Sequence, residues 1–235
     1  MDEKDKYLIA CNIKKHFEEE AKEFDEIIIK LIPYYHQMLD ALITSIPFEK
    51  NDEIKVIDLG CGTGTISKMV KESYPFASIH CVDIAKNMIE IAKHKLSKYS
   101  DITYENADLT QYFFTNSYDV VLSSLTLHHL VTDKDKINFY TKVYHALNSN
   151  GVFYNADNVI GSNEAMQENN MLHWKNFMRK TVSEEEIEQT WIKRYLEEDR
   201  PAKLIDQLNW LKDIGFVDID VIWKYYNFAV YGGKK

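Results

Sequence analysis

The chain has 235 residues, of which 45% are hydrophobic, and its formal net charge is −9 at pH 7. This length suits one α/β domain with an elaboration, and the hydrophobic content supports a sizeable core. The negative charge disfavours nucleic acid as a partner, because binding to a polyphosphate normally depends on clustered Lys and Arg. We interpret the basic cluster between Lys93 and Lys98 as the solvated face of a helix.

The cysteines and the apolar stretches indicate in which cellular compartment the protein is expected. Cys11, Cys61 and Cys81 form neither an even disulfide framework nor a metal-type pair, and no N-terminal stretch has the pattern of a signal peptide. Lys30 and Pro33 interrupt the best apolar stretch, so no segment approaches the roughly 20 residues that span a bilayer. We therefore expect a soluble, cytoplasmic protein that does not bind membranes.

Helices are predicted for the first 50 residues, where apolar positions recur at helical spacing. We interpret residues 1–50 as an N-terminal helical cap and residues 51–235 as the main domain. From Ile54 onward, short apolar runs alternate with amphipathic segments. The first predicted strand starts at Ile54, and the others are 78–83, 102–105, 118–124 and 151–157. The first predicted helix between the strands starts at Thr65, and the others are 87–96 and 136–147.

This alternation stops after Asp157. Residues 162–199 are predicted to form a helical insertion, rich in Met, Trp and Glu. This insertion serves either as a lid or as a dimer surface, so a homodimer is one of the two alternatives. A helix over 202–216, stopped at Gly215, and two strands with a tight reversal over 217–233 complete the chain. The pattern predicts an α/β fold with a Rossmann-like, doubly wound sheet, mostly parallel, with an antiparallel hairpin at the C-terminus and helices on both faces.

The residues VIDLGCGTG join an apolar strand to a helix through three alternate glycines. Gly60, Gly62 and Gly64 suit positions that need a positive φ or a close approach of the backbone to a ligand. Asp58 closes the strand, and we interpret Cys61 as a small turn residue rather than a nucleophile. A strand, a glycine turn and a helix N-terminus together make a cradle for an anion or a nucleotide.

The spacing of the glycines distinguishes between kinds of cradle. A dinucleotide site needs G-x-G-x-x-G and a phosphate loop needs G-x-x-x-x-G-K-[ST], and the chain has neither here. The G-x-G-x-G form, with Asp58 two residues before the first glycine, resembles motif I of the class I methyltransferases, which bind S-adenosylmethionine. The alternative is a tight turn that packs helix on sheet and binds no ligand.

Two further acids follow predicted strands. Asp83 lies about 20 residues beyond the glycine turn, where an acid accepts hydrogen bonds from both hydroxyls of a ribose. Its alternative role is to cap the helix over 87–96. Asp108 is placed to accept from an adenine amino group, and Leu109 or Ala107 to pack on the ring. Because ligands bind outside the carboxyl ends of parallel strands, both acids are predicted to share one rim with the glycine turn.

The segment YDVVLSSLTLHHL completes the resemblance to small-molecule and ubiquinone-type class I methyltransferases. The flanks also resemble one subgroup, the bacterial carboxy-S-adenosylmethionine synthases of wobble-uridine modification and their uncharacterised methyltransferase relatives. Those synthases carry Gln-Phe where this chain has His128 and His129. The arginine that holds their extra carboxylate has no clear counterpart beyond Arg194 or Arg200, which we expect the acids at 197–199 to engage.

The resemblance implies an S-adenosylmethionine-dependent methyltransferase that transfers a methyl group to a small-molecule acceptor and releases S-adenosylhomocysteine. Two alternatives stay open: synthesis of the carboxylated cofactor or transfer of a carboxymethyl group, and a cofactor-binding module without catalysis. His128 and His129 are the candidate catalytic residues, one of them as a general base. No metal is expected, because consecutive residues on a helix diverge by about 100°. The predicted cofactor-binding residues are Asp58, Gly60, Cys61, Gly62, Gly64, Asp83, Ile84, Met88, Asp108, Leu109, Ser124 and Leu125.

Overall fold

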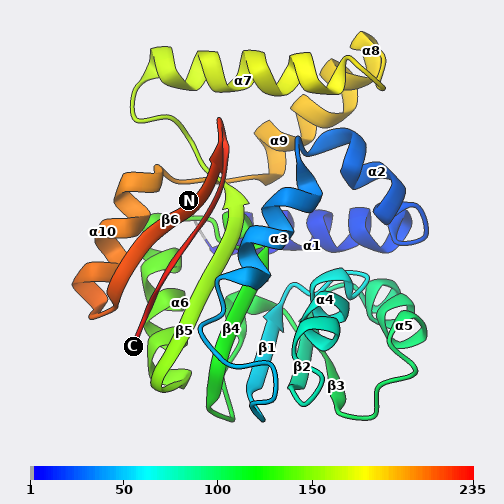
Figure 1. Ribbon diagram of the computed structural model, residues 1–235. Helices are drawn as coiled ribbons and strands as arrows, with labels where there is room; N and C mark the ends of the chain where they lie inside the picture. Colours follow the sequence, from blue (N-terminus) through cyan, green and yellow to red (C-terminus); the bar gives the residue numbers. More distant parts are fainter. Residues whose placement is uncertain (1–2) are drawn as a thin grey trace.

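A seven-stranded sheet runs through the centre of the computed structural model, which describes residues 3–235 (Figure 1). The strand order is β3-β2-β1-β4-β5-β7-β6. The first five strands are parallel, and β7 pairs antiparallel with β5 and with β6, which confirms the predicted fold class. The strands are β1 Lys55–Leu59, β2 Ser78–Asp83, β3 Ile102–Asn106, β4 Tyr118–Ser124, β5 Leu147–Asn158, β6 Val217–Tyr225 and β7 Phe228–Lys234.

Helices cover both faces of the sheet, because alternate side chains of the buried strands point to opposite sides. In β1, Val56 belongs to the core beneath α4 (Thr65–Ser73), whereas Ile57 belongs to the core beneath α6 (Asp133–Ala146) and α10 (Leu204–Ile214). Helix α5 (Lys86–Lys95) follows β2. Two short 3₁₀ turns, η1 (Leu109–Gln111) and η2 (Leu127–His129), follow β3 and β4.

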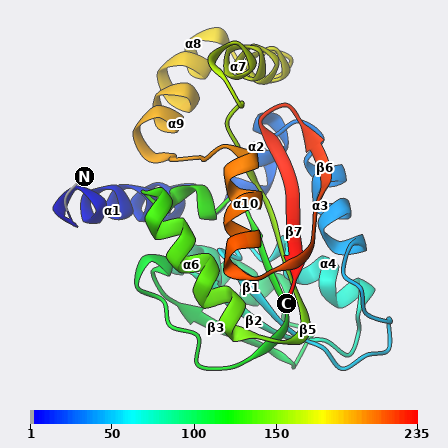
Figure 2. The same ribbon diagram turned by 90° about the vertical axis from the view of Figure 1, so that its left-hand side faces the viewer.

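The N-terminal segment is helical, as predicted, with α1 at Glu3–Glu20, α2 at Phe24–Leu31 and α3 at Tyr35–Thr44. Helix α1 lies across the carboxyl ends of the strands (Figures 1 and 2). Near one end, Lys6 Nζ lies 3.0 Å from Asp135 Oδ1 at the start of α6. Near the other end, the Glu18 carboxylate accepts the Lys86 and Asn87 amides at the start of α5, at 2.7 and 2.9 Å. Helix α1 therefore bridges helices on both faces of the sheet.

The insertion consists of α7 (Glu164–Met178), α8 (Glu184–Glu186), a π-helical turn η3 (Ile187–Ile192) and α9 (Lys193–Glu198). It stands above the carboxyl edge of the sheet in both views (Figures 1 and 2). Trp174 Nε1 donates to the Leu31 carbonyl of α2 at 2.8 Å, and Arg194 Nη1 lies 2.6 Å from Glu20 Oε1 of α1. These contacts join the insertion to the N-terminal helices, far from it in sequence.

Several predicted boundaries shift for identifiable reasons. Helix α6 begins at Asp133 rather than at 136, because Thr132 and Asp135 form a capping box. Strand β5 begins at Leu147, before the predicted glycine turn. Helix α10 ends as predicted at Gly215, which has a φ of 119°.

Between residues 3 and 235, no helix is both long enough and apolar enough to cross a bilayer.

Candidate functional site

The glycine turn is built as predicted, with a positive φ at each of its three glycines. The Gly60 and Cys61 amides donate to the Val82 carbonyl at 2.8 and 3.0 Å, which ties the turn to β2. A Cβ on Gly64 would lie 2.9 Å from Leu96 Cδ1, so this glycine allows close packing against the end of α5. A Cβ on Gly62 would meet no atom within 4 Å. Gly62 thus leaves open space beside the turn.

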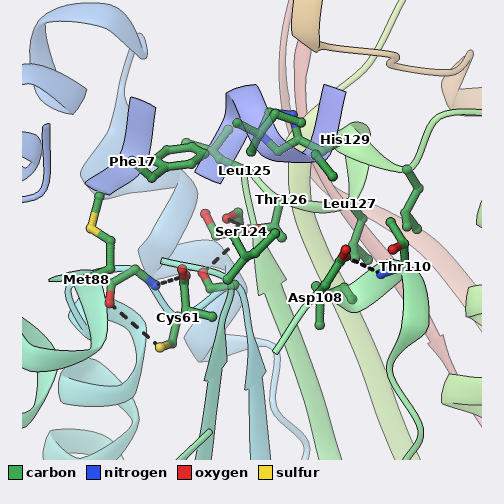
Figure 3. Close-up of a pocket in the computed structure, with 18 of the residues that line it drawn as sticks. Phe17, Cys61, Met88, Asp108, Thr110, Ser124, Leu125, Thr126, Leu127 and His129 are labelled. Atoms are coloured by element: carbon green, nitrogen blue, oxygen red, sulfur yellow. Dashed lines mark hydrogen bonds between the residues drawn. The ribbon is translucent and has the colours of Figure 1, made fainter. Parts of the chain in front are cut away.

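This space belongs to a cavity at the carboxyl ends of β1, β2 and β4, which we call the rim cavity. It comprises about 1060 Å³ of empty space, which includes space open to solvent, and α1 covers it. Figure 3 shows Cys61 and Met88 on one side of it, Asp108 and Thr110 on the other, and Phe17 and His129 above. Its size and largely apolar lining suit a small ligand.

Most of the predicted cofactor-binding residues line the rim cavity. They come from the turn after β1, from the end of β2, from η1 and from the end of β4. The lining includes Gly60, Cys61, Gly62, Asp83, Ile84, Met88, Asp108, Leu109, Ser124 and Leu125, and also the candidate catalytic residue His129. The predicted residues Asp58, Gly64 and His128 do not line it.

Asp83 is held rigidly at the edge of the rim cavity. Its Oδ2 accepts the Gly62 amide and its Oδ1 accepts the Ala85 amide, both at 2.8 Å. Burial raises the pKa of Asp83 to about 6. The alternative role as helix cap is wrong, because Ala85 occupies the N-cap position of α5 and Glu18 accepts the next two amides. The carboxylate links the glycine turn to the end of β2.

Asp58 lies beneath the turn rather than on the wall of the rim cavity. It is fully buried, and Ser67 Oγ donates to its Oδ2 at 2.7 Å. Its Oδ1 has no hydrogen-bond partner among the described residues. Burial and the nearby charge of Asp83 raise the pKa of Asp58 to about 7. Asp108, the third predicted acid, accepts the Thr110 amide at 2.8 Å and begins η1.

Sequence reasoning missed the contribution of α1 to the rim cavity. Residues from one face of this helix line it, namely Lys6, Ile9, Ala10, Ile13 and Phe17. They recur at intervals of three and four, which is the spacing of one helical face. That periodicity was available in the sequence, but it does not say which part of the sheet the face covers.

A second cavity adjoins the first, and we call it the cap cavity. It lies between the N-terminal helices and the insertion and comprises about 860 Å³ of empty space, which includes space open to solvent. Aromatic residues of both segments line it, among them Trp174, Trp191 and Tyr195. The residues that line both cavities are Phe17, Phe24, Leu125 and His129. The two cavities therefore share a wall formed by the N-terminal helices and the segment that follows β4.

The two histidines of η2 do not diverge as predicted. Their ring centroids are 4.1 Å apart, and both rings approach the carboxylate of Asp199, which follows α9. The prediction was wrong because the backbone angle does not set the positions of the rings: consecutive residues of this 3₁₀ turn diverge by about 120°, yet their side-chain rotamers bring both rings to Asp199. Burial would lower the pKa of His128, but Asp199 and Asp157 raise it to about 10. Burial and the charge of His128 lower the pKa of His129 to about 4.

The two arginines have other partners than the predicted acids. Arg194 pairs with Glu20 of α1, lies 5.0 Å from the centroid of the Trp191 ring and lines the cap cavity. The Arg200 guanidinium donates to backbone carbonyls at the end of α9, including those of Glu197 at 2.9 Å and Asp199 at 2.6 Å. Arg200 thus closes a helix end, and only Arg194 of the two reaches a cavity.

Comparison with known proteins agrees with this geometry. Residues 56–151 match the methyltransferase domain family. A carboxy-S-adenosyl-L-methionine synthase of Campylobacter hominis is 28% identical, with 97% of this chain and 98% of that protein covered. A malonyl-[acyl-carrier protein] O-methyltransferase of Priestia megaterium is 30% identical over 48% of this chain and 40% of its own.

Solved structures share the fold. The structure of PigF with SAH has a TM-score of 0.65 at 14% identity, covering 96% of this chain and 62% of PigF. The Haemonchus contortus phosphoethanolamine N-methyltransferase 2 in complex with S-adenosyl-L-methionine has a TM-score of 0.59 at 22% identity. That match covers 80% of this chain and 38% of the nematode protein.

Residues 56–151 match the methyltransferase domain, and the fold and the glycine turn agree with a class I, S-adenosylmethionine-dependent methyltransferase. The similarity to the carboxy-S-adenosyl-L-methionine synthases extends along almost the whole chain.

Proposed function

We propose that the enzyme transfers the methyl group of S-adenosylmethionine, held in the rim cavity, to a small-molecule acceptor held in the cap cavity. The observation that carries this proposal is that the two cavities are neighbours, with Phe17, Phe24, Leu125 and His129 in the lining of both. A methyl transfer needs its two reactants side by side in line, and holding them so supplies much of the rate enhancement.

The chemistry of the rim cavity fits the cofactor. Bound S-adenosylmethionine supplies a methyl group on a positively charged sulfur, and its amino-acid portion carries an ammonium group. Asp83 and Asp108 line the cavity, and the buried Asp58 has one oxygen without a hydrogen-bond partner among the described residues. An acidic lining suits a cationic ligand, because buried carboxylates gain from a nearby positive charge.

Each acid has a proposed role. Asp83 binds the ribose hydroxyls, since its two oxygens each keep acceptor capacity beyond the amide that they accept. Asp108 binds the adenine amino group, and Leu109 packs on the ring. Gly60, Gly62 and Gly64 let the backbone approach the amino-acid portion, with Asp58 behind them. These assignments rest on the resemblance and on the lining of the rim cavity.

We assign His128 and His129 to the acceptor rather than to the cofactor. His129 borders both cavities, and His128 lines the cap cavity alone. The N-terminal helices and the insertion 162–199 form the walls of the cap cavity, so we propose that they act as the lid that selects the acceptor and excludes water. The predicted dimer and the cytoplasmic location stay predictions, which sedimentation and cell fractionation would test.

The test uses methyl-labelled S-adenosylmethionine and a pool of small metabolites. Formation of S-adenosylhomocysteine together with a labelled product is expected for the wild type and also for Asp213→Asn, a matched change on an exposed part of α10. Asp83→Asn should weaken cofactor binding by about 1.5–3 kcal/mol, or roughly 10–150-fold. Tight cofactor binding with no turnover in any pool would contradict the proposal and favour a binding module.

A second candidate function is synthesis or use of the carboxylated cofactor. Arg194 favours it, because this arginine lines the cap cavity and an added carboxylate needs a cation. Against it, Arg194 is already paired with Glu20. Competition binding of the two cofactors decides the matter. Tighter binding of the carboxylated form, lost in Arg194→Ala but kept in Arg200→Ala, would replace the first proposal with the second.

A further inference from the structure

Three side chains with metal-binding atoms converge on one wall of the cap cavity. His128 and His129 come from η2, and Asp199 comes from the residue after α9, so two segments about 70 residues apart in sequence meet here. The donor atoms of the three side chains lie within 4.8 Å of one another. The side chains of the three residues are 7%, 16% and 18% exposed, and all three residues line the cap cavity.

The spacing of these atoms suits a shared ion better than direct hydrogen bonds. Asp199 Oδ1 lies 3.4 Å from His128 Nε2 and 3.5 Å from His129 Nδ1. Hydrogen bonds between nitrogen and oxygen are usually about 2.7–3.2 Å long. Two ligands that each lie about 2.0–2.2 Å from a tetrahedral metal ion are roughly 3.3–3.6 Å apart. Both distances to Asp199 fall in that second range, and the donor atoms of the two histidines lie within 4.8 Å of each other.

His129 also lacks the partners that a buried imidazole needs. Neither its Nδ1 nor its Nε2 has a hydrogen-bond partner among residues 3–235, although both atoms are inaccessible to solvent. An unsatisfied buried polar group costs about 1–3 kcal/mol. A metal ion bound at Nδ1 would remove one of these two unsatisfied atoms.

The surrounding residues hold the ligands in a binding orientation. Asp157 Oδ1 lies 2.5 Å from His128 Nδ1, and Asp157 Oδ2 accepts the His128 amide at 3.0 Å. A carboxylate on one imidazole nitrogen fixes its proton there and leaves the other nitrogen free to bind a metal. The Arg200 amide donates to the His128 carbonyl at 3.0 Å, which fastens the Asp199 segment to η2.

We propose that His128 Nε2, His129 Nδ1 and the Asp199 carboxylate bind one divalent transition-metal ion. Two imidazoles and one carboxylate suit Zn²⁺, Fe²⁺ or Mn²⁺ and not Mg²⁺, which prefers oxygen ligands. Three protein ligands leave a coordination position for a further group, as in catalytic metal sites. That position faces the cap cavity. The binding of an acceptor oxygen or nitrogen to the ion rests on the proposed function, whereas the binding of the ion itself does not.

The test is titration of the full-length, chelator-treated protein with Zn²⁺ and with Co²⁺, in the absence of cofactor. Calorimetry should give one site per chain, and Co²⁺ should give the visible absorption of a four- or five-coordinate ion with nitrogen and oxygen ligands. Mg²⁺ should not bind at this site. His129→Gln and Asp199→Asn should each weaken Zn²⁺ binding more than the roughly 10–100-fold expected from loss of an outer-shell partner.

His16→Gln is the matched control, because His16 lines the same cavity but pairs with Glu198 outside the cluster. It should keep wild-type affinity. Circular dichroism of every variant shows whether it is folded, and Asp199→Asn keeps the experiment decisive if His129→Gln unfolds. The proposal is overturned if the wild type binds no ion, if both folded variants keep its affinity, or if His16→Gln loses as much as they do. None of these measurements depends on methyltransferase activity. The metal site and the proposed methyl transfer are therefore tested independently.

Discussion

Gly62 and Gly64 share a positive φ but face different surroundings. A side chain on Gly62 would project into the rim cavity, whereas one on Gly64 would press on Leu96 and Ala92 of the α5 segment. Both substitutions pay a backbone cost of about 1–2 kcal/mol. Any difference between the two substitutions in cofactor affinity or in stability therefore shows whether each glycine makes room for the ligand or for the packing of α5.

We predict that Gly62→Ala weakens binding of S-adenosylmethionine with a modest loss of stability, and that Gly64→Ala mainly lowers the melting temperature. Calorimetry gives the affinity, and thermal unfolding gives the stability. Equal affinity in the wild type and in folded Gly62→Ala would mean that the turn serves packing alone.

The buried Asp58 makes stability depend on pH. Its folded pKa of about 7 lies above the ordinary value of 3.8, so between these values the folded chain holds a proton that the unfolded chain has lost. The contribution of Asp58 to stability therefore falls as pH rises from about 4 to 7, by up to about 1.4 kcal/mol per pH unit. Asp83, with a pKa raised to about 6, acts in the same direction.

We predict that Asp58→Asn flattens this dependence in the cofactor-free protein. Urea unfolding at several pH values between 4.5 and 7.5 measures it. If the wild type and Asp58→Asn lose stability equally over this range, the proton is held elsewhere.

At the scale of elements, α1 is the piece that covers the rim cavity. It contributes a face of residues to the lining, and it is fixed at both ends by Lys6–Asp135 and by Glu18 at the start of α5. A cofactor beneath this helix should suppress its local opening, because opening would expose the bound ligand.

Hydrogen exchange should therefore slow in α1 when S-adenosylmethionine is added. Helix α10, which packs on the sheet away from both cavities, serves as the internal control: its exchange by local opening should be unchanged, and only amides that exchange through global unfolding should slow. Unchanged exchange in α1 at saturating cofactor would show that the helix is a fixed wall.

For the whole molecule, the rim cavity couples the ligand to the global fold. Strand ends, the glycine turn and α1 all line it, so unfolding of any of them releases the cofactor. At 100 times the dissociation constant, a ligand that binds only the folded state adds about 2.7 kcal/mol.

For a chain of this size, that addition should raise the melting temperature by about 5–11 °C. Differential scanning fluorimetry with increasing S-adenosylmethionine measures it, and Asp83→Asn at the same concentrations should shift less. An identical shift in this variant would place the stabilising site elsewhere on the molecule.

The sequence by itself determined the sheet, its two helical faces and most of the rim cavity. These features depend on local patterns: apolar runs that alternate with amphipathic segments, and glycines where a strand turns into a helix. The carboxyl ends of parallel strands meet at one edge of the sheet. The sequence alone therefore predicts that acids which follow separate strands, such as Asp83 and Asp108, lie at the same edge.

Only the tertiary structure decided what covers that edge and what meets there. The face of α1 was readable as a pattern, but its position depends on contacts with α5 and α6 that no local rule supplies. The convergence of His128, His129 and Asp199 depends on the path of the insertion, which brings Asp199 back to η2. Local preference sets the period of a segment, whereas contacts between segments far apart in sequence arise from packing of the whole chain, and the cap cavity is made of such contacts.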